Sequence, residues 1–144
     1  MTSFAARADS SFSDFEKMYG DQVREQLNCI RRHKMTEDNR YLIVRMSDGY
    51  VQCMFHDEDT QVYCEVSSGF YNADQRRFSD TERSALAAEG FDMSAIGKNY
   101  PMDMEANLEE VAARMLRASY FGFGARVDDI KTFGPFADVC RYIS

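Results

Sequence analysis

Hydrophobic residues near the start of the chain recur at intervals of three or four positions: Phe12, Phe15, Tyr19, Val23, Leu27 and Ile30. This spacing puts them on one face of an amphipathic helix, which the pattern predicts from about Ser11 to Lys34. Gly20 lies inside the helix and lowers its intrinsic stability by about 1 kcal/mol relative to alanine. We therefore expect packing to stabilise the helix, and we expect residues 1–11, which carry little apolar pattern, to fray.

The chain then changes to an alternation of apolar and polar residues, which is typical of half-buried strands. Two such runs, Arg40–Met46 and Tyr50–His56, flank Asp48-Gly49. Asp-Gly is typical of a two-residue hairpin turn, because both residues tolerate positive φ. Counting outward from this turn pairs the apolar residues of the two strands: Met46 with Val51, Val44 with Cys53, and Leu42 with Phe55.

A second turn follows at Asp57–Thr60, which consists of good turn formers and predicts a four-residue loop. It sets His56 opposite Gln61, and it pairs Phe55 with Val62, Cys53 with Cys64, and Val51 with Val66. The two turns select the same face of the predicted sheet as the core. That face comprises Leu42, Val44, Met46, Val51, Cys53, Phe55, Val62, Cys64 and Val66.

The opposite face of this three-stranded meander mixes aromatic, thioether and charged side chains. It carries Tyr41, Ile43, Arg45, Tyr50, Gln52, Met54, His56, Tyr63 and Glu65. A mixed face of this kind fits contact with a partner protein. The alternative is that a later segment of the same chain, such as Tyr120–Gly124 or the C-terminus, packs against it.

A capping box marks the start of a later helix. Ser79 precedes Glu82 by three residues, so the Ser79 hydroxyl can accept a first-turn N–H while the Glu82 side chain reaches back to the cap residue. The helix should end at Gly90, where glycine accepts the left-handed conformation and Phe91 can fold back. The apolar spacing of Glu105–Tyr120 predicts a third helix.

The last segment, from Val127 to Ser144, is ambiguous, and within it Ala137–Ile143 fits a terminal helix better than a strand. Together the elements predict an α+β fold with one domain over residues 1–144. It has an N-terminal helix, an antiparallel meander of three strands that further strands would extend, and two or three later helices on one face.

The charge of the chain narrows the range of partners. Seventeen basic and 24 acidic side chains give a formal net charge of −7. The average surface field therefore repels nucleic-acid phosphates and anionic membrane surfaces, and we expect neither as a partner. No apolar stretch has the length of a signal peptide core or a membrane span, so a cytoplasmic protein is expected.

The residues that usually carry chemistry do not form a recognisable site. Cys29, Cys53, Cys64 and Cys140 show no C-x-x-C spacing, and we expect reduced, buried thiols. A cross-strand redox pair of Cys53 and Cys64 is the alternative. His56 should point to the opposite face from both, so no catalytic pair results. The spacing of the histidines does not suit zinc. We expect no catalytic residues, metal ligands or cofactor.

The chain resembles the YbjN-like and TY-Chap domains, whose fold is similar to that of type III secretion chaperones. The resemblance covers about residues 13–125 and rests on three segments: GYVQCMFHDEDTQVYCEVSS, RFSDTERSALAAEGFD and LEEVAARMLRASYFGF. It implies a small protein that binds or regulates another polypeptide, commonly as a homodimer, and that has no catalytic residues.

These observations give a first functional hypothesis, a non-catalytic chaperone-like or adaptor domain. Methionine and aromatic side chains adapt to varied partners. Met102 and Met104, beside Pro101, are expected to be exposed. The predicted partner-binding residues are Tyr41, Ile43, Tyr50, Met54, Tyr63, Met102 and Met104.

A second hypothesis is a small-molecule sensor or enzyme with an aromatic pocket between the meander and the third helix. The pocket would be lined by Phe70, Tyr71, Phe91, Tyr100, Tyr120, Phe121 and Phe123. A third is a homodimer formed through a sheet edge or a helix, which is compatible with the first.

Overall fold

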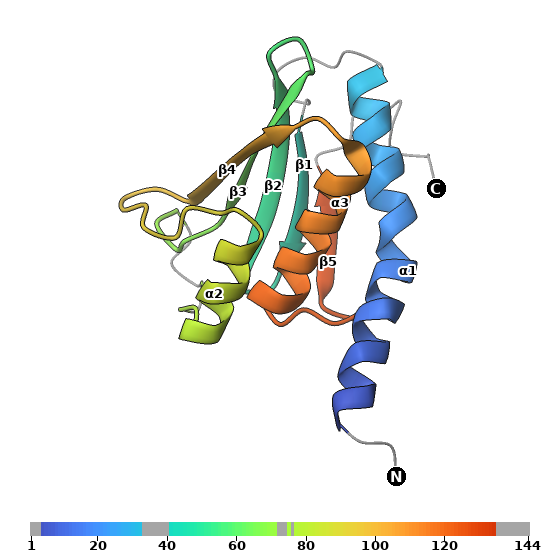
Figure 1. The fold of residues 1–144 in the computed structure, drawn as a ribbon, viewed down its shortest axis with the longest axis vertical. Coiled ribbons are helices and arrows are strands. Elements are labelled where there is room, and N and C mark those ends of the chain that lie inside the picture. The colour runs from blue at the N-terminus through green and yellow to red at the C-terminus, as the bar shows by residue number, and fades with distance from the viewer. Residues whose placement is uncertain (1–3, 33–40, 72–74, 76, 135–144) are drawn as a thin grey trace.

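The computed structural model describes residues 4–32, 41–71, 75 and 77–134, and it has the predicted α+β fold (Figure 1). In chain order the elements are α1 Phe4–Arg32, β1 Tyr41–Met46, β2 Gly49–His56, β3 Gln61–Val66, α2 Asp80–Ala88, β4 Tyr100–Glu105, α3 Leu108–Arg117, the π-helix η2 Ala118–Gly122, and β5 Ile130–Gly134.

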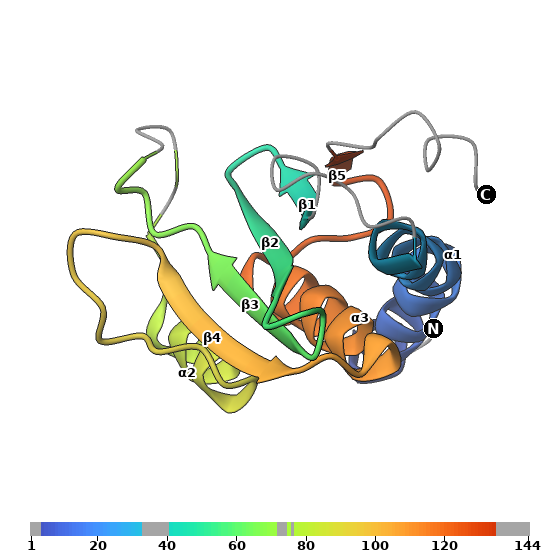
Figure 2. The same cartoon turned by 90° about the horizontal axis from the view of Figure 1, so that it is seen from above.

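The strands form one sheet in the order β4-β3-β2-β1-β5, and each neighbouring pair is antiparallel. The three α-helices lie on the same side of this sheet (Figure 2). The hydrophobic core lies between the helices and the sheet, and it includes Phe15 and Leu27 of α1 and Val111 and Met115 of α3. We call the opposite surface of the sheet the outer face.

The pairing of β2 with β3 confirms the predicted register. His56 lies opposite Gln61 and Cys53 opposite Cys64. Phe55 pairs with Val62 and Val51 with Val66, as predicted. All nine residues of the predicted core face are buried, with at most 6% of any side chain exposed. The alternation of the sequence therefore gave the correct inner face.

The predicted register between β1 and β2 was wrong by two residues. Met46 pairs with Gly49, so the turn consists of Ser47 and Asp48, and Gly49 is the first residue of β2. A Cβ on Gly49 would come within 2.4 Å of the Phe123 ring. Glycine is needed here for close packing, and an even shift of register leaves every side chain on its predicted face.

Two strands lie outside the predicted meander. β4 extends the sheet beyond β3, although Pro101 interrupts its pattern, because an edge strand tolerates proline. β5 lies in the segment that was ambiguous in sequence. The predicted terminal helix Ala137–Ile143 lies outside the described residues.

The helices agree with the predictions except at some ends. α1 begins at Phe4, before the predicted start, and ends at Arg32. The capping box of α2 is present, and Gly90 follows the helix with φ of 106°. The third helix starts later than predicted because Glu105 belongs to β4 and the Asn107 side chain caps α3.

Two helical glycines, Gly122 of η2 and Gly20 of α1, provide a matched test of how η2 packs on α2. A Cβ on Gly122 would lie 2.4 Å from Leu86, whereas one on Gly20 would meet only the flexible end of Arg24. We predict that Gly122→Ala lowers the free energy of unfolding by about 1–3 kcal/mol, because a buried clash must be relieved. Gly20→Ala should be neutral or stabilising by up to about 1 kcal/mol. Urea unfolding measures both, and equal effects would contradict the packing of η2 on α2.

Candidate functional site

The outer face is only partly covered. Ile43 is buried, with 6% of its surface exposed, whereas Met54 in the neighbouring strand is 40% exposed. Tyr41, Tyr50 and Tyr63 have intermediate exposure. The sequence left open whether Tyr120–Gly124 or the C-terminus packs on this face. The structure shows that Ile43 is buried and Met54 is open, and that Tyr120 and Phe123 belong to the hydrophobic core; residues 135–144 lie outside the described residues.

A row of side chains crosses four strands at the open part of the outer face. Tyr41 pairs with Met54, Met54 with Tyr63, and Tyr63 with Asp103 of β4. We call these four residues the Met54 row. Cross-strand neighbours are close enough to act as one surface, so the row presents a thioether between two phenol rings, with a carboxylate at one end.

Beside this row lies a hydrogen-bonded group centred on Glu65. Its Oε1 accepts bonds from Gln52 Nε2 at 2.6 Å and Asn99 Nδ2 at 3.2 Å. Its Oε2 accepts a bond from the Tyr63 hydroxyl at 3.1 Å. The Asn99 amide also donates to the Tyr50 hydroxyl at 2.9 Å, and its oxygen accepts from the Ser68 N–H. These bonds hold Glu65 and the two tyrosines in fixed positions.

The phenol of Tyr63 is kept protonated by its surroundings. Its pKa is raised first by burial and then by the negative charge of Glu65, with a further contribution from Asp103. A protonated phenol can keep donating to Glu65, so the side chain stays in place on the outer face.

Tyr71 also lies near the open part of this face. It is close enough to Tyr63 to contribute to the raised pKa of that phenol. The ring of Tyr71 stacks edge-on against Phe70 at 4.8 Å, and the two side chains are 67% and 60% exposed. The sequence pattern did not indicate Tyr71 and Asn99 as parts of this face, because both residues lie outside the strands that the alternation predicted.

The cysteines are bonded, which corrects the prediction of reduced thiols. Cys53 and Cys64 form a disulfide on the inner face, where their Cα atoms are 4.0 Å apart. Directly opposed residues of a non-hydrogen-bonded pair are the closest in an antiparallel sheet, so the register brings the two sulfurs together. Cys29 is also disulfide-bonded.

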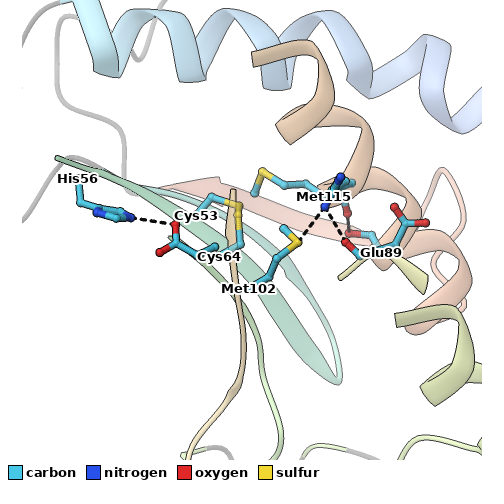
Figure 3. The surroundings of a disulfide bond; sticks show 9 residues. Cys53, His56, Cys64, Glu89, Met102 and Met115 are labelled. Carbon is cyan, nitrogen blue, oxygen red and sulfur yellow. Dashed lines mark hydrogen bonds and ion pairs between the residues drawn. A yellow bond between two sulfur atoms is a disulfide. The ribbon is translucent and has the colours of Figure 1, made fainter. Parts of the chain in front are cut away.

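His56 is separated from this disulfide, as predicted. Figure 3 shows the disulfide on the side of the sheet that faces α3, with His56 near the strand end and bonded to Asp103. The Nε2–Oδ1 distance is 3.0 Å, and Asp57 lies 3.6 Å from the other ring nitrogen. The pair offers no nucleophile for catalysis, because the neighbouring sulfurs are oxidised and lie on the other face.

The predicted exposure of Met102 and Met104 was wrong. Met102 is 5% exposed and Met104 is partly buried, because both point to the helix side of β4. The sulfur of Met102 lies 3.4 Å from an Arg114 nitrogen and near the disulfide (Figure 3). Reading Pro101 as a loop signal concealed the strand that turns these side chains inward.

The aromatic residues of the second hypothesis do not share one pocket. Phe91, Tyr120 and Phe123 are buried in the core, whereas Phe70, Tyr71 and Phe121 are exposed. Two open depressions on the described surface lie elsewhere. One is lined by residues including Arg31, Gln61 and Asn107, and the other by Lys17, Asp21, Glu110 and their neighbours between α1 and α3.

Within the described ranges, no group of three or more His, Cys, Asp or Glu side chains has the geometry to hold a metal ion. The helices in the same part of the chain are too short or too polar to span a membrane. Protein-family models, curated proteins and solved structures give no match to the chain.

The His56 contact gives a prediction on pH. Its pKa is raised above 6.5, mainly by the hydrogen bond from the ring to Asp103. Because the folded state favours the charged imidazole, this small stabilisation is fully present below about pH 6.5 and is lost as the pH rises through the folded pKa. NMR titration should give a pKa above 6.5, and Asp103→Asn should lower it more than Asp57→Asn does. An unchanged pKa in Asp103→Asn would refute the contact.

Proposed function

We propose that the chain is a non-catalytic, chaperone-like or adaptor domain that binds a segment of another polypeptide on the open part of the outer face. The observation that carries the proposal is the Met54 row, in which a 40% exposed methionine lies between two tyrosines on a sheet face that none of the described helices covers. Aromatic and methionine side chains are enriched in protein interfaces.

The form of this surface favours a polypeptide over a small molecule. Small ligands bind in concave pockets that enclose most of their surface, whereas the Met54 row lies on the broad face of a sheet. The fixed positions of Tyr50, Tyr63 and Glu65 lower the entropic cost of binding, because fewer side chains have to be ordered. Of the residues predicted to bind a partner, we retain Tyr41, Tyr50, Met54 and Tyr63. The other three, Ile43, Met102 and Met104, are buried or face the core.

The resemblance to YbjN-like and TY-Chap domains is part of this proposal and is consistent with polypeptide binding. A homodimer that pairs β4 with its copy has less support. Pro101 has no N–H to donate, and its carbonyl accepts a bond from the Asp92 N–H at 2.8 Å. Asp103 and Glu105 add like charges along this edge, which discourages strand addition.

The disulfides indicate in which cellular compartment the protein works. A cytoplasmic location was expected from the sequence, but the reducing cytosol keeps most thiols unpaired. Cys53–Cys64 and the bonded Cys29 support an oxidising compartment, and we propose that the protein works there.

Site-specific photo-crosslinking tests the binding face. A photoreactive phenylalanine analogue at Met54 should capture a discrete polypeptide from a lysate of the source cells, whereas the same analogue at Met18, which is 59% exposed on α1, should not. With the captured polypeptide purified, Met54→Ser should weaken binding by about tenfold or more, because central interface residues dominate affinity. Met18→Ser is the matched control. Equal capture at both positions, or unchanged affinity in Met54→Ser, would exclude this face.

The compartment has its own test. Protein isolated from its source after rapid alkylation of free thiols should yield a disulfide-linked peptide pair containing Cys53 and Cys64. Recovery of both residues as alkylated thiols would contradict an oxidising compartment and would restore the cytoplasmic prediction.

A further inference from the structure

The charges around the Met54 row point to one class of partner. Glu65 and Asp103 lie on the outer face, and Asp57, where β2 ends, lies on the other side of the His56 ring from Asp103. Among the ion pairs within the described residues, none involves Glu65, and Asp103 contacts only the imidazole of His56. This part of the surface is therefore negative, apart from any charge on His56.

Arg45, a basic side chain of the outer face, forms no ion pair with Asp103 or Glu65 among the described residues. Arg45 belongs to β1, and its guanidinium lies over the Tyr50 ring, 5.6 Å from the centroid. It pairs with Tyr50 across the strands, whereas Met54 and Asp103 lie towards the opposite end of the sheet. Arg45 and Asp103 thus occupy different parts of the same face, whereas Glu65 lies between them and is connected to Tyr50 through Asn99.

Glu65 has room to accept another hydrogen bond. A carboxylate offers about four acceptor positions, and three are used by Gln52, Asn99 and Tyr63. Those three bonds also fix the direction of the free position. A bond from a charged donor to such a group is about twice as strong as a neutral one.

Tyr63 and Tyr71 add a second means of holding a cation. Tyr71 is 67% exposed, and phenol rings attract a positively charged group above their faces. Carboxylates beside aromatic rings are well suited to lysine and arginine side chains, whose stems can also pack on Met54.

We propose that the polypeptide bound by this domain is basic. An apolar side chain of the bound segment packs on Met54 between Tyr41 and Tyr63, and neighbouring lysine or arginine side chains contact Asp103 and Glu65. This inference rests on the proposed function and adds the chemistry of the partner. The net charge of −7 speeds encounter with a basic partner, and it disfavours a second copy of the chain on this face.

Fluorescence anisotropy with three labelled peptides tests the inference on the oxidised, full-length protein. The peptides share one pattern of leucines and carry lysine, glutamine or glutamate at the positions between them. The lysine peptide should bind about tenfold or more tightly than the glutamine peptide, the glutamate peptide should bind most weakly, and the preference for lysine should shrink with added salt.

Substitutions test which residues cause the preference for the lysine peptide. Asp103→Asn and Glu65→Gln should each weaken the binding of the lysine peptide several-fold more than that of the glutamine peptide. Glu109→Gln, an exposed change of the same charge on α3, is the matched control and should change neither. Circular dichroism checks the fold, and Asp103→Asn, at an exposed position, remains informative where Glu65→Gln disturbs the packing.

The outcomes separate the two proposals. Equal, Met54-dependent binding of the lysine and glutamine peptides would overturn the basic partner and leave polypeptide binding intact. A preference for lysine that Asp103→Asn and Glu65→Gln leave unchanged, or that Glu109→Gln reduces equally, would also overturn it, because only net charge would be sensed. Binding of no peptide in a Met54-dependent way would count against both.

Discussion

The pairing of β2 with β3 is the constraint on which the rest of the structure depends. Strand side chains alternate between the two faces, so this one register decides what the helices cover and what remains outside. It sets Cys53 against Cys64 on the inner face, where the disulfide fixes the pairing covalently. The same register sets Met54 against Tyr63 on the outer face. The buried core and the proposed binding face are two consequences of one alternation.

The two faces are stabilised in different ways. The inner face is apolar and packs against α1 and α3, with Met102 and Met115 near the disulfide (Figure 3). None of the helices in the described part of the chain lies over the outer face (Figure 2), and its order comes from hydrogen bonds among Gln52, Glu65 and Asn99. Such a network leaves the aromatic and thioether groups fixed but exposed. A surface with fixed side chains suits binding, because little order has to be gained when the partner arrives.

The sequence predicted the elements whose structure depends on local chemistry. The predictions were wrong at the elements whose structure depends on tertiary contacts. Alternation and the Asp57–Thr60 turn gave the core face and the β2–β3 register, and the Ser79 capping box gave the start of α2. The Asp48-Gly49 turn was misplaced because the Phe123 ring, distant in sequence, requires glycine at the start of β2. β4 was not predicted because Pro101 indicated a loop, whereas the edge of a sheet tolerates proline. The disulfide was expected only as the alternative, since the thiol state depends on the surroundings of the cell as well as on the register.

Methionine oxidation tests the central claim that one face of the sheet is filled and the other is open. In dilute peroxide, followed by peptide mass spectrometry, the oxidation rate of each methionine reports its access to solvent. We predict that Met54, which is 40% exposed, oxidises much faster than Met102 and Met115, which are 5% and 1% exposed. A bound polypeptide should slow the oxidation of Met54 and leave that of Met18 unchanged. Met102 reacting as fast as Met54, or a partner that protects Met18 and not Met54, would contradict the assignment of the two faces.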